Sequence, residues 1–336
     1  HGTARDAQHR RMSKSLGNGI DPLDVVNLYG AGALRWTVIA GMGLGSDLLL
    51  DHENIEQSFA PGRNFATKLW NIGRFLLLQV GPEPVRPVAA LADAELVPAD
   101  HWILARIDTA IAAADAGLGP ARPAGAGAWP ERERKLGLRL DEFAESARAF
   151  VWNDLADWYL EHAKTRLAPG HAERETARAV LVHAFDQALR LLHPVMPFVT
   201  ETLWQKLPGR GTNEWLAQAA WPRALRRADT KVAAEFELER EFATAIREIK
   251  SGYAIPYSQT VQATLTGMVK VGDLIEVLDF VQKVSGSVIV PEDQVRPETA
   301  GRRILANGAE VRVAIEGIVD FAREREKLGT ELGQLQ

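Results

Sequence analysis

The sequence near the start of the chain is Arg11-Met12-Ser13-Lys14-Ser15-Leu16-Gly17-Asn18, and Ile20-Asp21-Pro22 follows it directly. This stretch predicts a short loop that carries two cations and two hydroxyls, with a helix beginning just behind it. Lysine supplies a point charge, hydroxyls donate hydrogen bonds and glycine lets the backbone come close, and a polyphosphate site needs all three. A solvated basic turn has the same local composition, so the flanking residues must distinguish the two.

Composition indicates an ordinary soluble globular protein, with 46% apolar and 25% charged residues. A length of 336 residues predicts two to three domains. The lack of cysteine excludes disulfides and thiolate zinc sites and agrees with a reducing cytoplasm. The net charge of -5 gives no overall attraction for nucleic acid, so RNA binding would depend on local patches. No apolar run is long enough to span a bilayer, so we expect no membrane contact.

Helical periodicity dominates the first 225 residues. Asp21 is a suitable N-cap, with Pro22 at the first helical position and Gly30 as the stop. A long helix is expected to end near residue 80, and it has an apolar face. That face consists of Phe65, Leu69, Ile72 and Leu76. Further helices are expected over 33–39, 101–116, 141–166, 173–192 and 200–207.

A second stripe follows the same long helix and consists of Asn64, Lys68, Asn71 and Phe75. A cation, two amides and an aromatic ring on one face suit unstacked RNA bases, because amides hydrogen-bond base edges and a ring stacks on them. By periodicity alone, an ordinary surface with one aromatic at the rim of the core is the simpler interpretation.

The pattern changes after residue 231. Strands are expected over 261–265, 287–290 and 311–315, and helices over 236–250 and 274–281. This combination predicts a small α+β module. The closing residues from Ile318 have apolar positions near heptad spacing, which is typical of the start of a coiled coil.

Four stretches together resemble the valyl-tRNA synthetases, a family of class I aminoacyl-tRNA synthetases in which the loop is known as KMSKS. They are residues 5–26, then 63–71 with Lys-Leu-Trp-Asn, then 150–161 with Trp-Asn-Asp-Leu-Ala-Asp-Trp-Tyr, and finally 192–204. They occur in the family's order. The leucyl and isoleucyl relatives share the loop and a looser form of the last stretch.

The resemblance implies a mainly α protein in several parts. Residues 1–55 would be the end of a Rossmann-type catalytic domain with the stem-contact region. Residues 56–225 would be the anticodon-binding helical bundle, with a flexible insertion at 117–140. Residues 226–316 would form a small α+β junction domain, and 317–336 the start of a C-terminal coiled coil. Because the chain begins at His1 and ends in mid-pattern, we expect an interior piece of a longer protein.

The resemblance also implies a chemistry, namely ATP-dependent activation of valine to valyl-adenylate and its transfer to tRNA(Val). Lys14 would be the catalytic residue that meets the charge of the leaving pyrophosphate, and Arg11, Met12, Ser13, Lys14 and Ser15 would bind ATP. Arg11 replaces the family's first lysine. Magnesium would accompany ATP as part of the substrate, and no protein-bound metal is expected.

For tRNA, the resemblance adds support to the stripe of Asn64, Lys68, Asn71 and Phe75, because the family's anticodon contacts fall on this helix. Trp152, Asp157, Trp158 and Tyr159 are expected to be mainly core and buried polar pairs. Arg247 and Lys250 could contact tRNA phosphate, and solvated surface explains them equally well.

The chain by itself is expected to be inactive, since the ATP motif, the editing domain and the L-valine pocket lie upstream in the family. We expect a cytoplasmic monomer whose partners are tRNA(Val), ATP and L-valine. The alternatives are part of an isoleucyl- or leucyl-tRNA synthetase, or a non-catalytic tRNA-binding scaffold built from synthetase parts. Gly32 and Ser46 depart from the family pattern, at positions where the resemblance implies contact with the tRNA stem.

Overall fold

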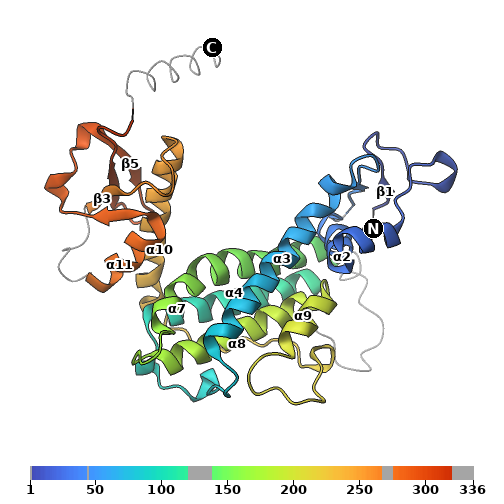
Figure 1. The fold of residues 1–336 in the computed structure, drawn as a ribbon, viewed down its shortest axis with the longest axis horizontal. Helices are drawn as coiled ribbons and strands as arrows, with labels where there is room; N and C mark the ends of the chain where they lie inside the picture. The colour runs from blue at the N-terminus through green and yellow to red at the C-terminus, as the bar shows by residue number, and fades with distance from the viewer. Residues whose placement is uncertain (1, 44, 120–137, 267–274, 320–336) are drawn as a thin grey trace, which may run out of the picture. The chain divides into compact units, whose positions relative to one another are not determined.

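The computed structural model describes residues 2–43, 45–119, 138–266 and 275–319, and the side chains of residues 275–277 are not considered. These residues form two compact units, His1–Ala233 and Ala234–Gln336. The architecture is mainly helical, as the sequence predicts, with two small sheets (Figure 1). None of the described helices has both the length and the apolar character that crossing a membrane requires.

The first unit begins with a small α/β part. Its elements are β1 (Ala4–Arg5), the 3₁₀ turn η1 (Lys14–Leu16), α1 (Pro22–Tyr29), α2 (Ala31–Ala40) and β2 (Leu48–Leu49). Strands β1 and β2 are parallel, with Ala4 opposite Leu48. Helix α1 begins as expected, because the Asp21 carboxylate accepts a hydrogen bond from the Leu23 amide at 2.9 Å.

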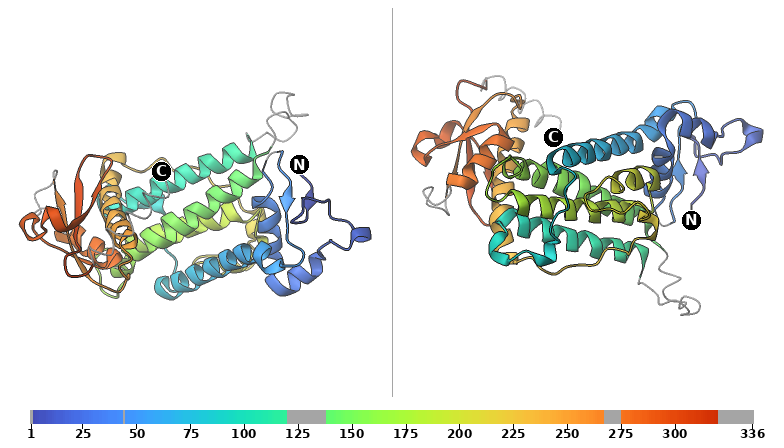
Figure 2. Two further views of the ribbon diagram at one scale, coloured as in Figure 1. Left: turned by 90° about the horizontal axis from the view of Figure 1, so that it is seen from above. Right: turned by 60° about the horizontal axis from the view of Figure 1, so that its bottom comes forward.

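A bundle of helices makes up the rest of the first unit. It contains α3 (Ile55–Val80), α4 (Pro98–Leu118), α6 (Leu140–Ala149), η4 (Phe150–Tyr159), α7 (Leu160–Arg166), α8 (Arg174–Leu192) and α9 (Pro197–Trp204). The turns η2 (Val88–Ala90), η3 (Asp93–Glu95) and η5 (Leu216–Gln218) lie in the connections. Helix α4 packs against α6 and α8, and α3 packs against α2, α8 and α9 (Figure 2).

The core of the bundle confirms the predicted apolar faces. Phe65, Leu69, Ile72 and Leu76 of α3 are all buried. Gly73 lies on the same side, where an added Cβ would meet the Leu203 side chain of α9 at 2.6 Å. Glycine at this position therefore lets α3 and α9 approach closely.

The single helix expected over 141–166 is wrong in detail. Residues Phe150–Tyr159 form a π-helix between the α-helical segments α6 and α7. At its end the Leu160 amide donates to the Leu155 carbonyl, five residues back. Side-chain periodicity near 3.6 does not distinguish the two helix types over ten residues, so the sequence pattern did not predict the change.

A buried polar cluster joins α4 to α7. The Asp100 carboxylate accepts both arms of the Arg166 guanidinium at 2.8 Å each and the Tyr159 hydroxyl at 2.7 Å. Arg166 also donates to Glu173 at 2.7 Å. Trp158 and Tyr159 are buried, which confirms the expectation of core and buried polar pairing for them.

The connection that follows the bundle runs along α4. Trp221 Nε1 donates to Asp115 at 2.8 Å, the Leu225 amide donates to Asp108 at 2.9 Å, and the Asp229 amide donates to His101 Nδ1 at 3.1 Å. The three partners on α4 are seven residues apart and so share one face of the helix. Two carboxylates and one imidazole on this face of α4 thus hold residues 221–229 in place.

The second unit is an α+β module. It contains most of α10 (Thr230–Gly252), then β3 (Val261–Thr266), α11 (Ile275–Ser285), β4 (Ser287–Ile289), η7 (Glu292–Gln294), η8 (Pro297–Thr299), β5 (Ala300–Ile304) and β6 (Glu310–Ala314). The strand order is β4-β3-β6-β5; β3 and β4 are parallel and the other pairs antiparallel.

The sequence did not predict β5. Its residues Ala-Gly-Arg-Arg-Ile have no apolar alternation, and only pairing with β6 makes them a strand. Charged residues on an edge strand are a common protection against unwanted pairing. Most of the expected coiled coil over 317–336 and most of the expected insertion at 117–140 lie outside the described residues, although α4 continues through Leu118 and α6 begins at Leu140.

Candidate functional site

A tight hairpin positions the predicted phosphate-binding loop. After β1 the chain turns back, so that the Asp6 amide donates to the Arg10 carbonyl at 2.9 Å and the Met12 amide to the Ala4 carbonyl at 3.2 Å. Asp47, just before β2, accepts the Thr3 amide at 2.7 Å and the Arg5 side chain. The predicted loop thus contains an ordered turn, and a short strand precedes it.

Asp6 and Asn18 close the base of the loop. The buried Asp6 carboxylate accepts the Arg10 amide at 2.8 Å and Asn18 Nδ2 at 2.8 Å. Asn18 Oδ1 in turn accepts the Ser13 amide at 2.9 Å. Burial raises the pKa of Asp6, but hydrogen bonds from Asn18 and Arg10 outweigh it and hold that pKa well below its usual range. A carboxylate that stays charged at neutral pH thus fixes both ends of the loop.

The two serines shape the tip of the loop. Ser13 caps η1, where its Oγ accepts the Leu16 amide at 3.3 Å and lies 3.2 Å from Ser15 Oγ. Gly17 ends the turn with φ +65° and donates its amide to the Lys14 carbonyl at 3.3 Å. That left-handed conformation favours glycine. The two hydroxyls therefore help to hold the turn.

Lys14 lies at the exposed tip of this turn. In the described part of the chain its ammonium has no hydrogen bond or ion pair, whereas the nearby Arg5 and Arg10 are both paired with carboxylates. Arg11 is exposed as well, and Met12 is half-buried against the cluster of Val25, Leu48, Leu50 and Phe59. The loop thus presents a cation to solvent from an anchored base.

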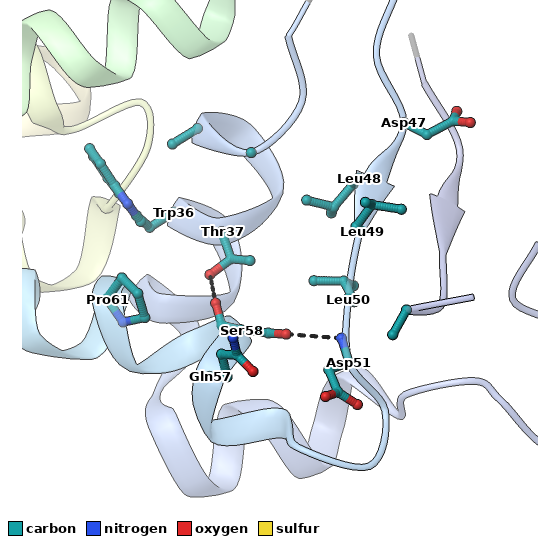
Figure 3. Close-up of a pocket in the computed structure, with 13 residues that line it drawn as sticks. Trp36, Thr37, Asp47, Leu48, Leu49, Leu50, Asp51, Gln57, Ser58 and Pro61 are labelled. Carbon is teal, nitrogen blue, oxygen red and sulfur yellow. Dashed lines mark hydrogen bonds between the residues drawn. The ribbon is translucent and has the colours of Figure 1, made fainter. Parts of the chain in front are cut away.

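A pocket of about 750 Å³ lies beside the hairpin, between β2 and the ends of α2 and α3 (Figure 3). Leu48, Leu49 and Leu50 line one side and Trp36 the other. Its polar groups bond to one another: Thr37 Oγ1 donates to the Ser58 carbonyl at 3.1 Å, and the Asp51 amide to Ser58 Oγ at 3.1 Å. These bonds tie the start of α3 to β2. Across the described residues, no group of three His, Asp or Glu side chains is placed to hold a metal ion.

The stripe of Asn64, Lys68, Asn71 and Phe75 is partly engaged in packing. Lys68 Nζ donates to Asp157 of η4 at 3.1 Å and lies 4.8 Å from the ring centroid of Trp152. The Lys164 ammonium of α7 lies 5.2 Å from the Phe75 ring centroid. Asn64 and Asn71 are exposed, and Lys68 and Phe75 are half-buried. The stripe therefore lies along the seam between α3 and the η4–α7 segment.

Two family models match the chain. "tRNA synthetases class I (I, L, M and V)" matches residues 1–51, and "Anticodon-binding domain of tRNA ligase" matches residues 136–265. Valine–tRNA ligase of Bacillus subtilis is 33% identical over 343 residues, which cover 100% of this chain and 36% of that protein. Valine–tRNA ligase of Enterococcus faecalis is 34% identical over 346 residues, covering 99% and 36%. The chain is homologous to valine–tRNA ligases along its whole length.

The chain spans about a third of the length of the valine–tRNA ligases that it matches. A solved ternary complex of Agrobacterium radiobacter LeuRS with tRNA and LeuAMS has a TM-score of 0.47 and 16% identity, covering 91% of this chain and 31% of that one. The loop of Arg11 to Ser15 lies inside the class I match. The stripe on α3 lies in neither matched segment.

Sequence reasoning missed the residues that hold the loop of Arg11 to Ser15 in place. The residue pair Asp6 and Asn18 is twelve positions apart in an irregular segment, where no periodic rule predicts contact. The counter-charge of Lys68 was missed because Asp157 lies 89 residues away.

The departures from the family pattern also have a structural account. An added Cβ at Gly32 would meet the Met196 methyl at 3.0 Å, and the Ser46 hydroxyl donates to the Gly43 carbonyl at 3.0 Å.

The suggestion that Arg247 and Lys250 contact tRNA phosphate is not supported by their positions. Arg247 Nε donates to the Val284 carbonyl at 2.7 Å, and Lys250 is buried among backbone carbonyls. Arg247 is half-buried and Lys250 is buried, and both bond to carbonyls at the end of α11, which have no partner within the helix.

Proposed function

We propose that the protein acts as part of a valine–tRNA ligase, which activates valine with ATP and transfers it to tRNA(Val). Similarity to valine–tRNA ligases at 33–34% identity along the chain carries this proposal and favours it over an isoleucyl or leucyl enzyme. The anchored loop with an exposed Lys14 supports it, because a purely tRNA-binding scaffold has no need of such a loop. We infer a cytoplasmic monomer.

The chemistry assigns a role to each loop residue. The valine carboxylate attacks the α-phosphorus of ATP, the bond to the bridging oxygen breaks, and pyrophosphate leaves with its charge. Lys14 meets that charge as it develops, which stabilises the transition state more than the ground state. Ser13 and Ser15 hold the turn or donate to phosphate oxygens, while Arg11 and Met12 complete the ATP-binding loop. Mg²⁺ arrives with ATP, its ligands mainly phosphate oxygens and water.

We also propose the division of labour along the chain. Residues 1–55 supply the loop and the stem-contact region, 56–225 the anticodon-binding bundle, and 226–316 the junction domain, with a coiled coil beginning at 317. The family match to an anticodon-binding domain over residues 136–265 supports a tRNA-binding role for the bundle and part of the junction.

Within the bundle, the stripe on α3 is our proposed anticodon contact. Phe75 offers an aromatic face, and stacking of a base on such a ring contributes about 1–3 kcal/mol. Asn64 and Asn71 are exposed and offer amides to base edges. Lys68 offers a cation, but Asp157 neutralises it in the unbound protein. Binding of a phosphate by Lys68 therefore requires that it leave or share this carboxylate.

The test measures binding of the chain to three RNAs at fixed salt: tRNA(Val), tRNA(Ile), and tRNA(Val) with an altered anticodon. Fixed salt is needed because phosphate contacts make affinity salt-dependent. A preference for tRNA(Val) that disappears with the altered anticodon supports the proposal. Equal binding to all three would remove the support for an anticodon reader in this chain.

Three variants sharpen the assignment of Lys68. Lys68→Ala is expected to weaken binding and lower the magnitude of the salt slope by about 1. Asp157→Asn is expected to strengthen binding, because it frees Lys68 from its ion pair, and this gain should vanish in the double variant. Lys206→Ala, at an exposed lysine of the same unit, serves as the control. A gain from Asp157→Asn that persists without Lys68 would contradict the assignment.

A further inference from the structure

The ammonium of Lys250 is enclosed within the second unit. Lys250 belongs to the last turn of α10 and is 2% exposed. Its Nζ lies near four backbone carbonyl oxygens, which we name the carbonyl cage. They are those of Gln259 at 2.7 Å, Tyr257 at 3.0 Å, and Ser285 and Gly286 at 3.2 Å each. The Tyr257 ring, with its centroid 5.4 Å away, forms one wall.

The cage exists because α11 ends there. The last carbonyls of a helix have no partner in the helix and carry the negative end of its dipole. The Val284 carbonyl accepts hydrogen bonds from Arg247 Nε at 2.7 Å and from the Tyr257 hydroxyl at 3.0 Å. The next two carbonyls belong to the cage: that of Ser285 accepts Lys250 Nζ, and that of Gly286 accepts both Lys250 Nζ and the Val261 amide, the latter at 3.3 Å.

Glycine keeps the cage open. Gly286 has φ +62°, and an added Cβ would lie 2.8 Å from the Tyr257 carbonyl oxygen and 3.0 Å from Lys250 Nζ. A side chain there would both strain the backbone and intrude on the cation. The positive φ of Gly286, the close packing around it and the end of α11 together leave one small volume lined by oxygen atoms.

The ligands define which cations fit. Mg²⁺ and Ca²⁺ bind at about 2.0–2.1 and 2.3–2.6 Å and favour carboxylates, so a cage of neutral carbonyls at 2.7–3.2 Å suits neither. Rings of carbonyls are how K⁺ is held without its water, and NH₄⁺ is close to K⁺ in size. We propose that the carbonyl cage is a site for a large monovalent cation, filled by the ammonium of Lys250, which accepts K⁺ or NH₄⁺ when that side chain is shortened.

Two substitutions of Lys250 separate the effect of removing the positive charge from the effect of opening the space that the side chain fills. Lys250→Ala removes the ammonium and opens the cage to an external ion. Lys250→Met removes the charge but leaves an unbranched chain along the same path, so an ion cannot enter. Lys283→Ala is the matched control, since Lys283 is an exposed lysine in the last turn of α11, the helix whose end contributes to the cage.

Each protein is studied as the full chain in KCl, NH₄Cl, LiCl and tetramethylammonium chloride at equal concentration. Amide hydrogen exchange over residues 253–263 and 281–290 measures the local stability of the segments that form the cage. All nine tryptophans lie at or before residue 221, so tryptophan fluorescence follows the first unit as an internal control.

We expect wild-type protein and Lys283→Ala to behave alike in all four salts. Protection in Lys250→Ala should fall in LiCl and recover about tenfold in KCl or NH₄Cl at ten times the dissociation constant of the ion. Lys250→Met should stay unprotected in every salt. If Lys250→Ala unfolds the second unit, refolding by K⁺ or NH₄⁺ supports the proposal equally. Equal protection of Lys250→Ala in all four salts, folded or unfolded, overturns it.

Discussion

Lys14 is the loop residue whose proposed role depends on an ammonium that has no partner among the described residues. Its ammonium is exposed, while the neighbouring arginines are paired. We predict that Lys14→Ala in a complete ligase carrying these residues lowers valine-dependent ATP–pyrophosphate exchange by about a hundredfold or more, the usual cost of losing one group that stabilises developing charge. Lys14→Arg should lose less because the charge remains. A decrease confined to KM for ATP, with kcat unchanged, would contradict a transition-state role.

Asp6 acts on the same loop through its charge. Because its pKa is held well below the usual range, the stabilisation from this carboxylate is present above the pKa of an unfolded aspartate and is lost only as the pH falls through the lowered value. We predict that Asp6→Asn increases amide exchange at Arg10 and Ser13 at neutral pH. Wild-type protein should keep this protection down to pH 4. Loss of wild-type protection already near pH 5 would show that another group controls the loop.

At the scale of elements, the Asp100–Arg166 pair joins α4 to α7 in a fully enclosed position. Removing one member leaves an unpaired charge in the core, which costs about 3–5 kcal/mol. We predict this loss in the free energy of unfolding for Arg166→Ala, measured by urea denaturation with tryptophan fluorescence. The double variant Asp100→Leu with Arg166→Met should lose less than Arg166→Ala. If both lose equally, packing rather than the unpaired charge explains the effect.

Helix α10 carries a buried carboxyl group with the opposite pH behaviour. Burial, together with the charge of Glu235, raises the pKa of Glu239 to about 8. A raised pKa in the folded state means that the stabilisation is complete below the unfolded value and is lost as the pH rises through about 8. We predict that thermal melting of the second unit, followed by circular dichroism, shifts down between pH 7 and 9. Glu239→Gln should remove most of that shift, and an unchanged shift would assign it to another group.

At the scale of the whole molecule, the chain has two units, each with its own buried core. Such units can unfold in separate transitions. We predict that Arg166→Ala lowers the midpoint seen by tryptophan fluorescence and leaves exchange protection of β3 and β6 unchanged, and that Lys250→Ala does the reverse. A shift of both signals by either variant would show that the two units unfold as one.

The pattern of apolar residues predicted most of the helices in both units, because burying one face of a helix imposes a spacing that the sequence must carry. The N-cap at Asp21 and the apolar face of α3 were predictable for this local reason. The short strands β1, β2 and β5 were not. Strands β1 and β2 are far apart in the sequence, and β5, although it pairs with the neighbouring strand β6, has no apolar alternation.

The sequence by itself determined the helical periodicity, the start of α1 and the composition of the loop around Lys14, because these depend on residues within a few positions of one another. Tertiary structure alone decided which charged groups meet which polar partners. It paired Lys68 with Asp157, Asp6 with Asn18, and Lys250 with four carbonyls. The sequence around a lysine or arginine is the same whether its side chain faces solvent, a carboxylate or a helix end. Only the three-dimensional packing of distant segments therefore decides what the cation contacts.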